Sequence, residues 1–597
     1  MQKGTATDIG TAIDIPRRAI IAAARPGPLR VAIIRRSGGA PGRVVTRSAM
    51  DRDTEQQLQA AIARYQAGSH QDALESLRAL QQRLPDDLQL RFILGAMEVQ
   101  SGNFSQGRPH LEAAAAMQPG HLEATTLLGS AYRSLGETGP WIALWERFQQ
   151  AQPEDPGGHL GLAEALLQAA EHDRADQEIA TLCQLLGPEP DLFQAIGTLY
   201  HTAGRPADAI DFYRKGLALR PDDEAGRQNL AAALQESGAD HEAEQIYRDL
   251  LRHGSARPDV LRNLGTIYKD RDDLDTALDF YAKAMQLRRQ RLDQAELYRA
   301  ASDPAQRRTT LHSLRLELEQ LIHLAVCGIA VEGIERLITG YRQVIDELIS
   351  RGVEGQRILL EPEQFMQIGE VMQRLVHLEP TPALADGALN PELDVERIQA
   401  DYRNSGPGVV VVDDLLRPQA LTALRRYLHR STVWFGYGKA RGYCGSYMED
   451  GFGNALLLQL AGEMRQRLPQ IVGPHFLNQM WAYIYDQAMA GITAHADPAA
   501  VNLNFWLTPD EANLDPESGG LIVSLREAPR EWNFHEYNNR PEVLDPYVSG
   551  DNRVVVPHRC NRLVMFNSNL VHKTDDFRFK PGFENRRINV TMLFGRR

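Results

Sequence analysis

The sequence predicts an all-α solenoid of helical pairs over residues 52–291, followed by a mainly β domain over residues 396–597. The solenoid is indicated by a self-similarity that returns every 34 residues, which is typical of stacked helical repeats. The β domain is indicated by short alternating apolar stretches, which are typical of strands. Between the two, residues 292–395 keep apolar residues three and four positions apart, so we expect a helical connector there.

Composition and charge exclude several classes of protein. The chain has 597 residues, of which 43% are hydrophobic and 24% are charged, as in ordinary globular proteins. No apolar run approaches the ~18 residues of a membrane helix. A net charge of −13 argues against a nucleic-acid binder. The four cysteines lie far apart without a CxxC motif, which favours a reducing compartment, so we expect a cytoplasmic protein.

The first fifty residues differ in charge from the rest of the chain. They contain nine Lys or Arg residues and only two acids, Asp8 and Asp14. An Arg-rich, acid-poor start is typical of a targeting peptide or of a basic arm. We expect residues 1–51 to form a disordered basic leader, which a chain starting naturally at Met50 would lack.

Seven repeated units follow one another from Thr54. A small residue stands at position eight of each unit, where two helices must cross closely: Ala61, Gly95, Gly129, Ala163, Gly197, Ala231 and Gly265. A large residue stands at position 24 and is expected to fill the gap between neighbouring pairs: Leu77, Leu111, Trp145, Ile179, Tyr213, Tyr247 and Tyr281. Proline ends the second helix of four units: Pro85, Pro119, Pro153 and Pro221.

This pattern resembles the tetratricopeptide repeat family over about residues 54–291. The resemblance implies a solenoid whose concave surface binds a protein or peptide. It implies no chemistry for the repeats themselves.

Residues 396–597 contain the short apolar stretches that predict strands. A proline-rich break within residues 378–391 separates them from the connector. The predicted strands are 409–412, 481–485, 501–507, 521–523, 554–556, 563–566 and 588–594. Helices are expected at 418–430 and 454–468. Short strands in this arrangement favour a β-sandwich or a barrel.

Side chains that can bind a metal occur in this region. Residues i and i+2 of an extended segment point to the same side, so His495 and Asp497 can face one pocket. With His572 farther along the chain, two histidines and a carboxylate can form a facial triad for Fe(II). Arg587 begins the last predicted strand and can form two parallel hydrogen bonds with a carboxylate, and Thr591 shares its face.

These features, in this order, resemble the Fe(II)/2-oxoglutarate-dependent oxygenases, and most closely their prolyl-hydroxylase-like branch. Tyr485 lies ten residues before His495, where that branch has a tyrosine that contacts 2-oxoglutarate. The resemblance covers about residues 400–597 and implies a double-stranded β-helix, or jelly-roll, fold. Taken with the repeats, the chain resembles bacterial proteins that join tetratricopeptide repeats to such a domain.

The resemblance implies a role for each matching residue. The Fe(II) ligands would be His495, Asp497 and His572. The residues that bind 2-oxoglutarate would be Arg587, Thr591 and Tyr485. O2 would be the second cosubstrate, and no catalytic residue beyond the metal ligands is implied. Because a carboxylate ligand is present in place of a small residue, hydroxylation is favoured over halogenation.

Some assignments within this site have alternatives. Arg586 adjoins Arg587, and strand alternation with Thr591 favours Arg587. His558 is the rival for the distal histidine ligand, although a histidine in the core or on the surface is the simpler interpretation. The segment from His572 to Arg587 is long for this family and must bulge as a loop. His535 and Cys560 are interpreted as structural.

The leading hypothesis is an oxygenase that hydroxylates a side chain in a protein or peptide bound by the solenoid. The first alternative is a small-molecule hydroxylase whose repeats serve assembly. The second is a scaffold for protein interaction without catalysis. A transferase lacks support, because the sequence contains no phosphate-binding glycine-rich loop with its lysine.

Overall fold

The structure is a computed structural model that describes residues 51–66, 70–254, 257–353, 357–436, 442–486, 488–489, 491–538, 540–548, 550 and 552–597. The chain divides into two compact units, one ending at Ile246 and the other running from Tyr247 to Arg597. Apart from Asp51, the predicted leader lies outside the described residues. The division falls inside helix α12 (Asp240–Arg252), within the repeats and not after residue 291.

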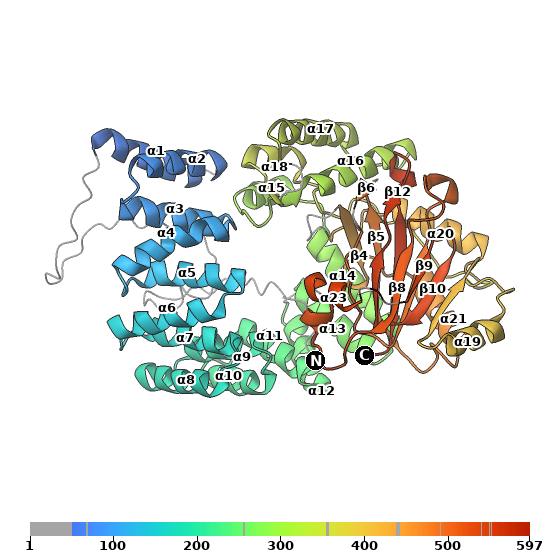
Figure 1. Ribbon diagram of the computed structural model, residues 1–597, viewed down its shortest axis with the longest axis horizontal. Helices are drawn as coiled ribbons and strands as arrows, with labels where there is room; N and C mark the ends of the chain where they lie inside the picture. Colours follow the sequence, from blue (N-terminus) through green and yellow to red (C-terminus); the bar gives the residue numbers. More distant parts are fainter. Residues whose placement is uncertain are drawn as a thin grey trace. The chain divides into compact units, whose positions relative to one another are not determined.

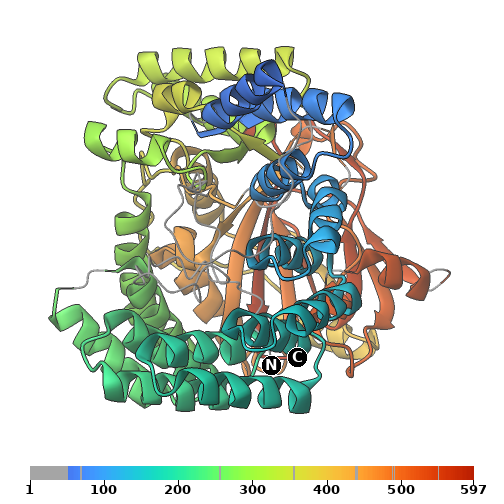
Figure 2. The same ribbon diagram turned by 90° about the vertical axis from the view of Figure 1, so that its left-hand side faces the viewer.

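Antiparallel helix pairs make up the described part of the first unit, coloured blue to teal in Figure 2. Its helices before α12 are α1 (Arg52–Gln66), α2 (His70–Arg83), α3 (Leu88–Gln100), α4 (Phe104–Met117), α5 (Leu122–Leu135), α6 (Thr138–Ala151), α7 (Pro156–Gln168), α8 (His172–Leu186), α9 (Pro190–Thr202), α10 (Pro206–Leu219) and α11 (Glu224–Glu236). Asp87, Asp155 and Asp223 stand at the same repeat position, and each accepts a backbone hydrogen bond as the N-cap of the next helix.

The small residues at position eight do permit close helix contact. A Cβ atom on Gly197 would lie 2.6 Å from the ring of Tyr213, so α9 and α10 could not keep their spacing with a larger residue. Tyr213 therefore fills space within its own pair, not between pairs as the sequence suggested. Trp145 does reach across, because a Cβ atom on Gly161 of the next pair would lie 2.2 Å from its ring.

The seventh helix pair belongs to the second unit. It consists of α13 (Pro258–Asp270) and α14 (Leu274–Arg289). Ala277 and Tyr281 of α14 lie in the same hydrophobic core as the strands and helices of the β-rich part. The Nζ atom of Lys269 donates to the backbone oxygen of Asn478, 2.7 Å away. This shared core explains why the division falls before the seventh pair.

The connector is helical, as predicted, and it has a core of its own. Its elements are α15 (Gln294–Ala301), α16 (Leu311–Val326), α17 (Ile334–Ser350) and α18 (Pro362–Ile368), with β1 (Arg308–Thr310) and β2 (Arg357–Leu359) paired antiparallel. It packs on the β-rich part as well: Gln320 donates to the backbone oxygen of Ser431, and Glu319 forms an ion pair with Arg586. The connector therefore contacts the β-rich part through side chains of α16.

Glu317 on α16 is a partly buried acid of the connector. It accepts a hydrogen bond from the Tyr341 hydroxyl at 2.6 Å, and burial raises its pKa to about 7. An acid with a raised pKa stabilises the fold most at low pH, and this contribution is lost as the pH rises toward the folded-state pKa.

Between pH 5 and pH 8, we expect the free energy of unfolding of the wild-type chain to fall by about 3 kcal/mol, and that of the Glu317→Gln variant to lack this fall. The reason is that the amide that replaces the carboxyl has no charge to bury. The measurement is the melting temperature of both proteins at the two pH values. Glu335→Gln, an exposed change on α17, is the matched control and should behave as wild type. Equal pH dependence of wild type and Glu317→Gln would contradict the assignment.

Two antiparallel sheets form the centre of the β-rich part (Figure 1). The six-stranded sheet has the order β3-β10-β7-β13-β5-β4, and the three-stranded sheet has the order β11-β8-β9. Their bounds are β3 (Val409–Val412), β4 (Tyr443–Tyr447), β5 (Leu477–Tyr485), β7 (Val501–Trp506), β8 (Leu521–Glu527), β9 (Arg553–Val556), β10 (Leu563–Asn567), β11 (Leu570–Thr574) and β13 (Ile588–Phe594). All seven predicted strands are present, whereas β4 and β11 were not predicted.

Shorter elements complete this part. They are α19 (Val395–Asn404), α20 (Pro418–Arg430), α21 (Ala455–Arg467), α22 (Phe534–Asn538), α23 (Pro541–Tyr547), β6 (Ala488–Met489), β12 (Phe577–Arg578) and the 3-10 turns η1 (Met448–Asp450), η2 (Asp510–Ala512) and η3 (Phe583–Asn585). The segment before Arg587 is therefore not one bulging loop, because it contains β12, which pairs with β6, and η3.

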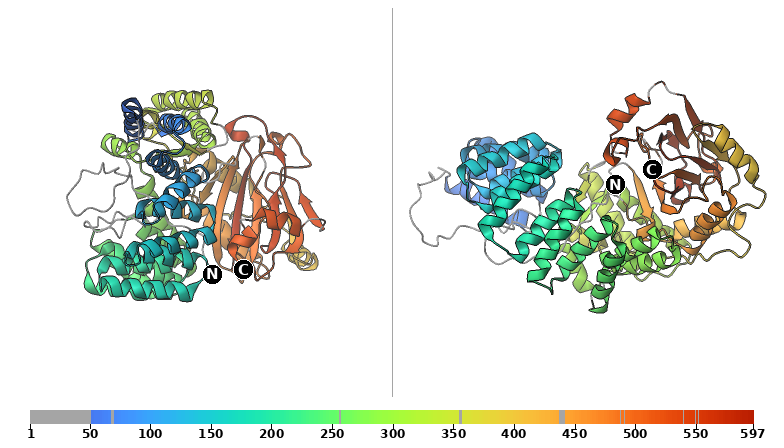
Figure 3. Two further views of the ribbon diagram at one scale, coloured as in Figure 1. Left: turned by 60° about the vertical axis from the view of Figure 1, so that its left-hand side comes forward. Right: turned by 90° about the horizontal axis from the view of Figure 1, so that it is seen from below.

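The two faces of the six-stranded sheet have different partners. One face shares a core with α20 and α21, which flank the sheet as yellow and orange helices in Figure 3. On the other face, here called the inner face, Trp506, Val564 and Phe566 pack with residues of β8 and β9. Alternation along the strands thus separates a helix-covered face from one that is turned toward the second sheet.

Candidate metal centre

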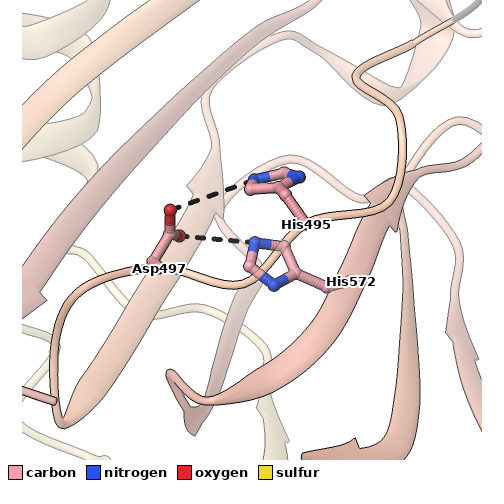
Figure 4. Close-up of side chains that lie close together, drawn as sticks. All are labelled: His495, Asp497 and His572. Atoms are coloured by element: carbon pink, nitrogen blue, oxygen red, sulfur yellow. Dashed lines mark ion pairs between the residues drawn. The ribbon is translucent and has the colours of Figure 1, made fainter. Parts of the chain in front are cut away.

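Three side chains predicted as metal ligands lie together in the structure (Figure 4). His495, Asp497 and His572 each offer one ligand atom, and these atoms all lie within 4.8 Å of one another. The Nε2 atom of His572 is 3.4 Å from Asp497 Oδ2, and the Nε2 atom of His495 is 4.0 Å from Asp497 Oδ1. Within the described residues, no other group of three histidine, cysteine or acidic side chains meets this criterion.

Backbone carbonyls orient both imidazole rings. The Nδ1 atom of His495 lies 2.8 Å from the oxygen of Thr493, and that of His572 lies 3.0 Å from the oxygen of Leu570. A carbonyl oxygen only accepts, so each Nδ1 must carry the proton. The Nε2 lone pairs are then directed toward Asp497, which is the tautomer that a metal-ligating histidine needs.

The carboxylate of Asp497 is buried but held in its charged form. Burial raises the pKa of its carboxyl, but the contacts with His572, His495 and Asn502 outweigh that effect, and the pKa lies below its usual range. Asn502 on β7 donates from Nδ2 to Asp497 Oδ2 at 2.8 Å. A charged, oriented carboxylate is the form that binds a cation.

The local backbone of the ligand segment differs from the prediction. Residues 495–497 are not part of a strand; His495 forms an isolated antiparallel bridge with His572. The extended course at this point still places His495 and Asp497 on one side. Ala496 turns away as predicted and packs with Tyr537 and Val571 in a small apolar cluster.

Arg587, predicted to bind a distant carboxylate, is almost fully buried directly before β13. Its side chain donates to the backbone oxygens of Gly519 and Gly520 at 2.7 and 3.1 Å, and its guanidinium lies 4.7 Å from the ring centre of Tyr485. Among the described residues it forms no ion pair with a carboxylate. A buried charge without a counter-ion costs several kcal/mol, so this position fits an anionic ligand.

The other two predicted cosubstrate residues lie on the same face. Thr591 pairs with Asn504 of β7, and its hydroxyl accepts a 3.0 Å hydrogen bond from the Asn504 Nδ2 atom. Burial raises the pKa of Tyr485, so its phenol stays protonated at neutral pH. Tyr485, Thr591 and Asn504 therefore place polar side chains on the inner face across the strands β5, β13 and β7.

The rival residues have other surroundings. Arg586 is paired with Glu319 at 2.7 Å and with Asp486 at 3.5 Å, so its charge is already neutralised. His558 is buried outside the ligand cluster, in contact with the rings of Trp506 and Phe579. The Sγ atom of Cys560 donates to a backbone oxygen, in line with a structural role.

Sequence analysis missed three asparagines at the site. Asn502, Asn504 and Asn589 are buried on the inner face and hydrogen-bond to Asp497, Thr591 and Arg587, respectively. Asparagine is a common turn residue, and no motif identified these three. The alternation of Asn502 and Asn504 within an apolar strand is the one signal that could have indicated a polar inner face.

The residues present fit Fe(II) and 2-oxoglutarate. Two neutral imidazoles and one carboxylate on one side of a site are the ligand set of non-haem iron oxygenases. Near them, the Oδ1 atom of Asn504 and the Nε1 atom of Trp506 are buried, and within the described residues neither has a hydrogen-bond partner. The Nε1–H of Trp506, a donor, and the charge of Arg587 are what a small dicarboxylate would satisfy.

Comparison with known proteins identifies the repeats. A family model described as Tetratricopeptide Repeats-Sensor matches residues 205–310, and a model described as Tetratricopeptide repeat matches residues 97–139. The chain therefore contains tetratricopeptide repeats, as predicted. Both matches lie in the helical part of the chain. No helix that the structure describes is both long and apolar enough to span a membrane.

Curated relatives and solved structures are similar over limited regions. Cellulose synthase 2 operon protein C of Komagataeibacter xylinus is 35% identical over 146 residues, which are 24% of this chain and 11% of that protein. Protein O-mannosyl-transferase TMTC1 of Homo sapiens is 31% identical over 98 residues, 16% of this chain and 11% of that protein. The matches thus span about a tenth of either relative's length. A tetratricopeptide repeat protein from Parabacteroides merdae has a TM-score of 0.35 and 15% identity, covering 39% of this chain and 93% of its own.

Proposed function

We propose that the second unit is an Fe(II)- and 2-oxoglutarate-dependent oxygenase with a jelly-roll fold. The observation that carries this proposal is the meeting of His495, Asp497 and His572, whose ligand atoms lie within 4.8 Å of one another. The four cysteines are free thiols, which favours a reducing, cytoplasmic compartment.

The chain's own residues would bind and orient the reactants. His495, Asp497 and His572 would hold the iron. The guanidinium of Arg587 would hold the far carboxylate, with Thr591 and Tyr485 beside it. When bound, iron and 2-oxoglutarate with O2 supply the oxidation of a C–H bond to an alcohol; one oxygen atom of O2 enters the alcohol and the other enters succinate, and CO2 is released. The buried inner face excludes water from this chemistry.

The repeats favour a protein or peptide as substrate. Tetratricopeptide solenoids bind extended or helical peptides on their concave surface. The seventh pair shares its core with the proposed oxygenase, so the last helix pair of the repeats packs directly on the β-rich part. We infer that the repeats recruit the chain whose side chain is hydroxylated. A small-molecule hydroxylase with repeats used for assembly remains the alternative within catalysis.

A scaffold for protein interaction is the candidate function from a different class. It is favoured by the comparisons, because the matched residues 97–139 and 205–310 all lie in the helical part. In this function the inner face would hold its polar residues for stability alone. The unpaired burial of Arg587 argues against that, because a structural site gains nothing from an uncompensated charge.

The test is an anaerobic titration of the whole chain with Fe(II) and 2-oxoglutarate. We expect the visible charge-transfer band of a chelated complex, and its loss in the His495→Ala variant, because two ligands alone hold iron weakly. His558→Ala is the matched control and should keep the band. Folded wild-type protein without a band would contradict the oxygenase and leave the scaffold function.

A further inference from the structure

The backbone of the ligand segment is held by three different parts of the second unit. His495 exchanges two hydrogen bonds with His572, at 3.0 and 2.8 Å, and the nitrogen of Asp497 donates to Ser568 at 3.1 Å. Both contacts come from β11 and the turn before it. The nitrogen of Ala496, which lies between the two ligands, does not donate to β11 or to that turn. It donates to the oxygen of Tyr537 at 2.8 Å.

The remaining carbonyl, that of Ala496, is satisfied by a side chain. The Nδ2 atom of Asn538 donates to this oxygen at 2.9 Å. Asn538 and Tyr537 end helix α22, which lies in the connection between β8 and β9. Helix α22 therefore supplies the partners for both backbone hydrogen bonds of Ala496, the residue between two proposed metal ligands. Because residues 495–497 form no strand ladder, these contacts take the place of the missing strand partner.

The helix is itself anchored from elsewhere in the unit. Tyr537 is buried, and the guanidinium of Arg597 lies 4.0 Å from its ring centre. Arg597 also donates to the oxygens of Trp532 and Pro529, at 3.1 and 2.6 Å, and to Asn569 at 2.5 Å. The position of Asn538 is thus determined by contacts that do not include the metal ligands.

We propose that Asn538 is a positioning residue of the metal centre, acting through the backbone of Ala496 on the His495–Asp497 pair. This inference rests on the proposed function, since it assumes that these residues bind a metal. The amide fixes the plane of the peptide that joins Ala496 to Asp497, and so the direction from which the carboxylate approaches the ion. Loss of an outer-shell partner of a metal ligand typically costs ~10–100-fold in metal affinity.

The experiment measures binding of Co(II) alone to the full chain by its visible ligand-field absorption, together with the charge-transfer band of the Fe(II) and 2-oxoglutarate complex. We expect Asn538→Ala to lower Co(II) affinity ~10–100-fold and to shift or broaden both absorptions. Asn390→Ala is the matched control, because Asn390 also donates from Nδ2 to a backbone oxygen, that of Asp414, away from the site. If the role of Asn538 were purely structural, Asn538→Ala and Asn390→Ala would both change the melting temperature. Neither variant would then change the Co(II) or the Fe(II) absorption spectrum.

A second variant guards against misfolding of the first. Asn538→Asp keeps the shape of the side chain but cannot donate to the Ala496 oxygen, so it should also weaken Co(II) binding despite its added negative charge. Wild-type affinity and spectra in both Asn538 variants, with binding abolished by His495→Ala, would overturn this inference and leave the proposed function intact. Wild-type affinity in His495→Ala would overturn both.

Discussion

Replacing Arg587 by methionine is expected to lower the affinity for 2-oxoglutarate about 100-fold or more while Fe(II) binding stays within a few-fold of wild type. Removing one partner of a buried, hydrogen-bonded charge pair costs ~2–5 kcal/mol. Arg587 is buried and, among the described residues, lacks an acidic partner, so a bound carboxylate would be its main counter-ion. Arg587 is not one of the three proposed metal ligands, His495, Asp497 and His572, so metal binding should persist.

Calorimetric titration of 2-oxoglutarate into the anaerobic Fe(II)-loaded chain measures this effect. Arg587→Lys keeps the charge but loses the planar pair of donors, so its affinity should fall between wild type and Arg587→Met. Equal affinity in wild type and Arg587→Met would show that Arg587 does not bind the cosubstrate.

Replacing Tyr281 by alanine is expected to destabilise the β-rich part by ~3–5 kcal/mol, although Tyr281 belongs to the seventh repeat. Tyr281 is 3% exposed and lies in the core shared with the six-stranded sheet. Its ring also fills the space next to Gly265, where a Cβ atom would come within 2.6 Å. Truncation to alanine leaves a cavity lined by residues of the seventh helix pair and of the β-rich part.

Hydrogen exchange of backbone amides locates this effect. Tyr281→Ala should speed exchange in β5 and β13 of the second unit. Tyr213→Ala is the matched control, because Tyr213 stands at the same repeat position, is fully buried, and belongs to the first unit. Its exchange effect should be confined to α9 and α10. Unchanged exchange in β5 and β13 of Tyr281→Ala would contradict the shared core.

The repeats could be predicted because their signal is local. Each pair needs a small residue, a large residue and a helix end at fixed positions within 34 residues, so the pattern is visible without knowledge of distant contacts. The three predicted metal ligands were also brought together, as ligand types at the correct spacing indicated. Their roles as metal ligands, and that of Arg587 toward a cosubstrate, stay predictions.

Other features depended on contacts far apart in the sequence. The strand β4 was missed because Gly445 and Ser446 weaken its strand signal, and only pairing with β5 forms it. The aspartate N-caps recur at one position of the repeat, so they do not show where the chain divides into two units. Tyr281 occupies the same repeat position as Tyr213, and the sequence does not reveal that Tyr281 lies in the core of the second unit.

The sequence by itself determined the helical repeats and most strands and indicated which side chains could bind a metal, because periodicity and residue chemistry are local properties. The tertiary structure alone decided where the units divide, which arginine is neutralised and what holds the ligand segment. Arg586 and Arg587 are neighbours of equal chemistry; alternation with Thr591 favoured Arg587, and the tertiary structure adds that Glu319 and Asp486 neutralise Arg586. Likewise, Asn538 reaches Ala496 only because the chain between them folds back.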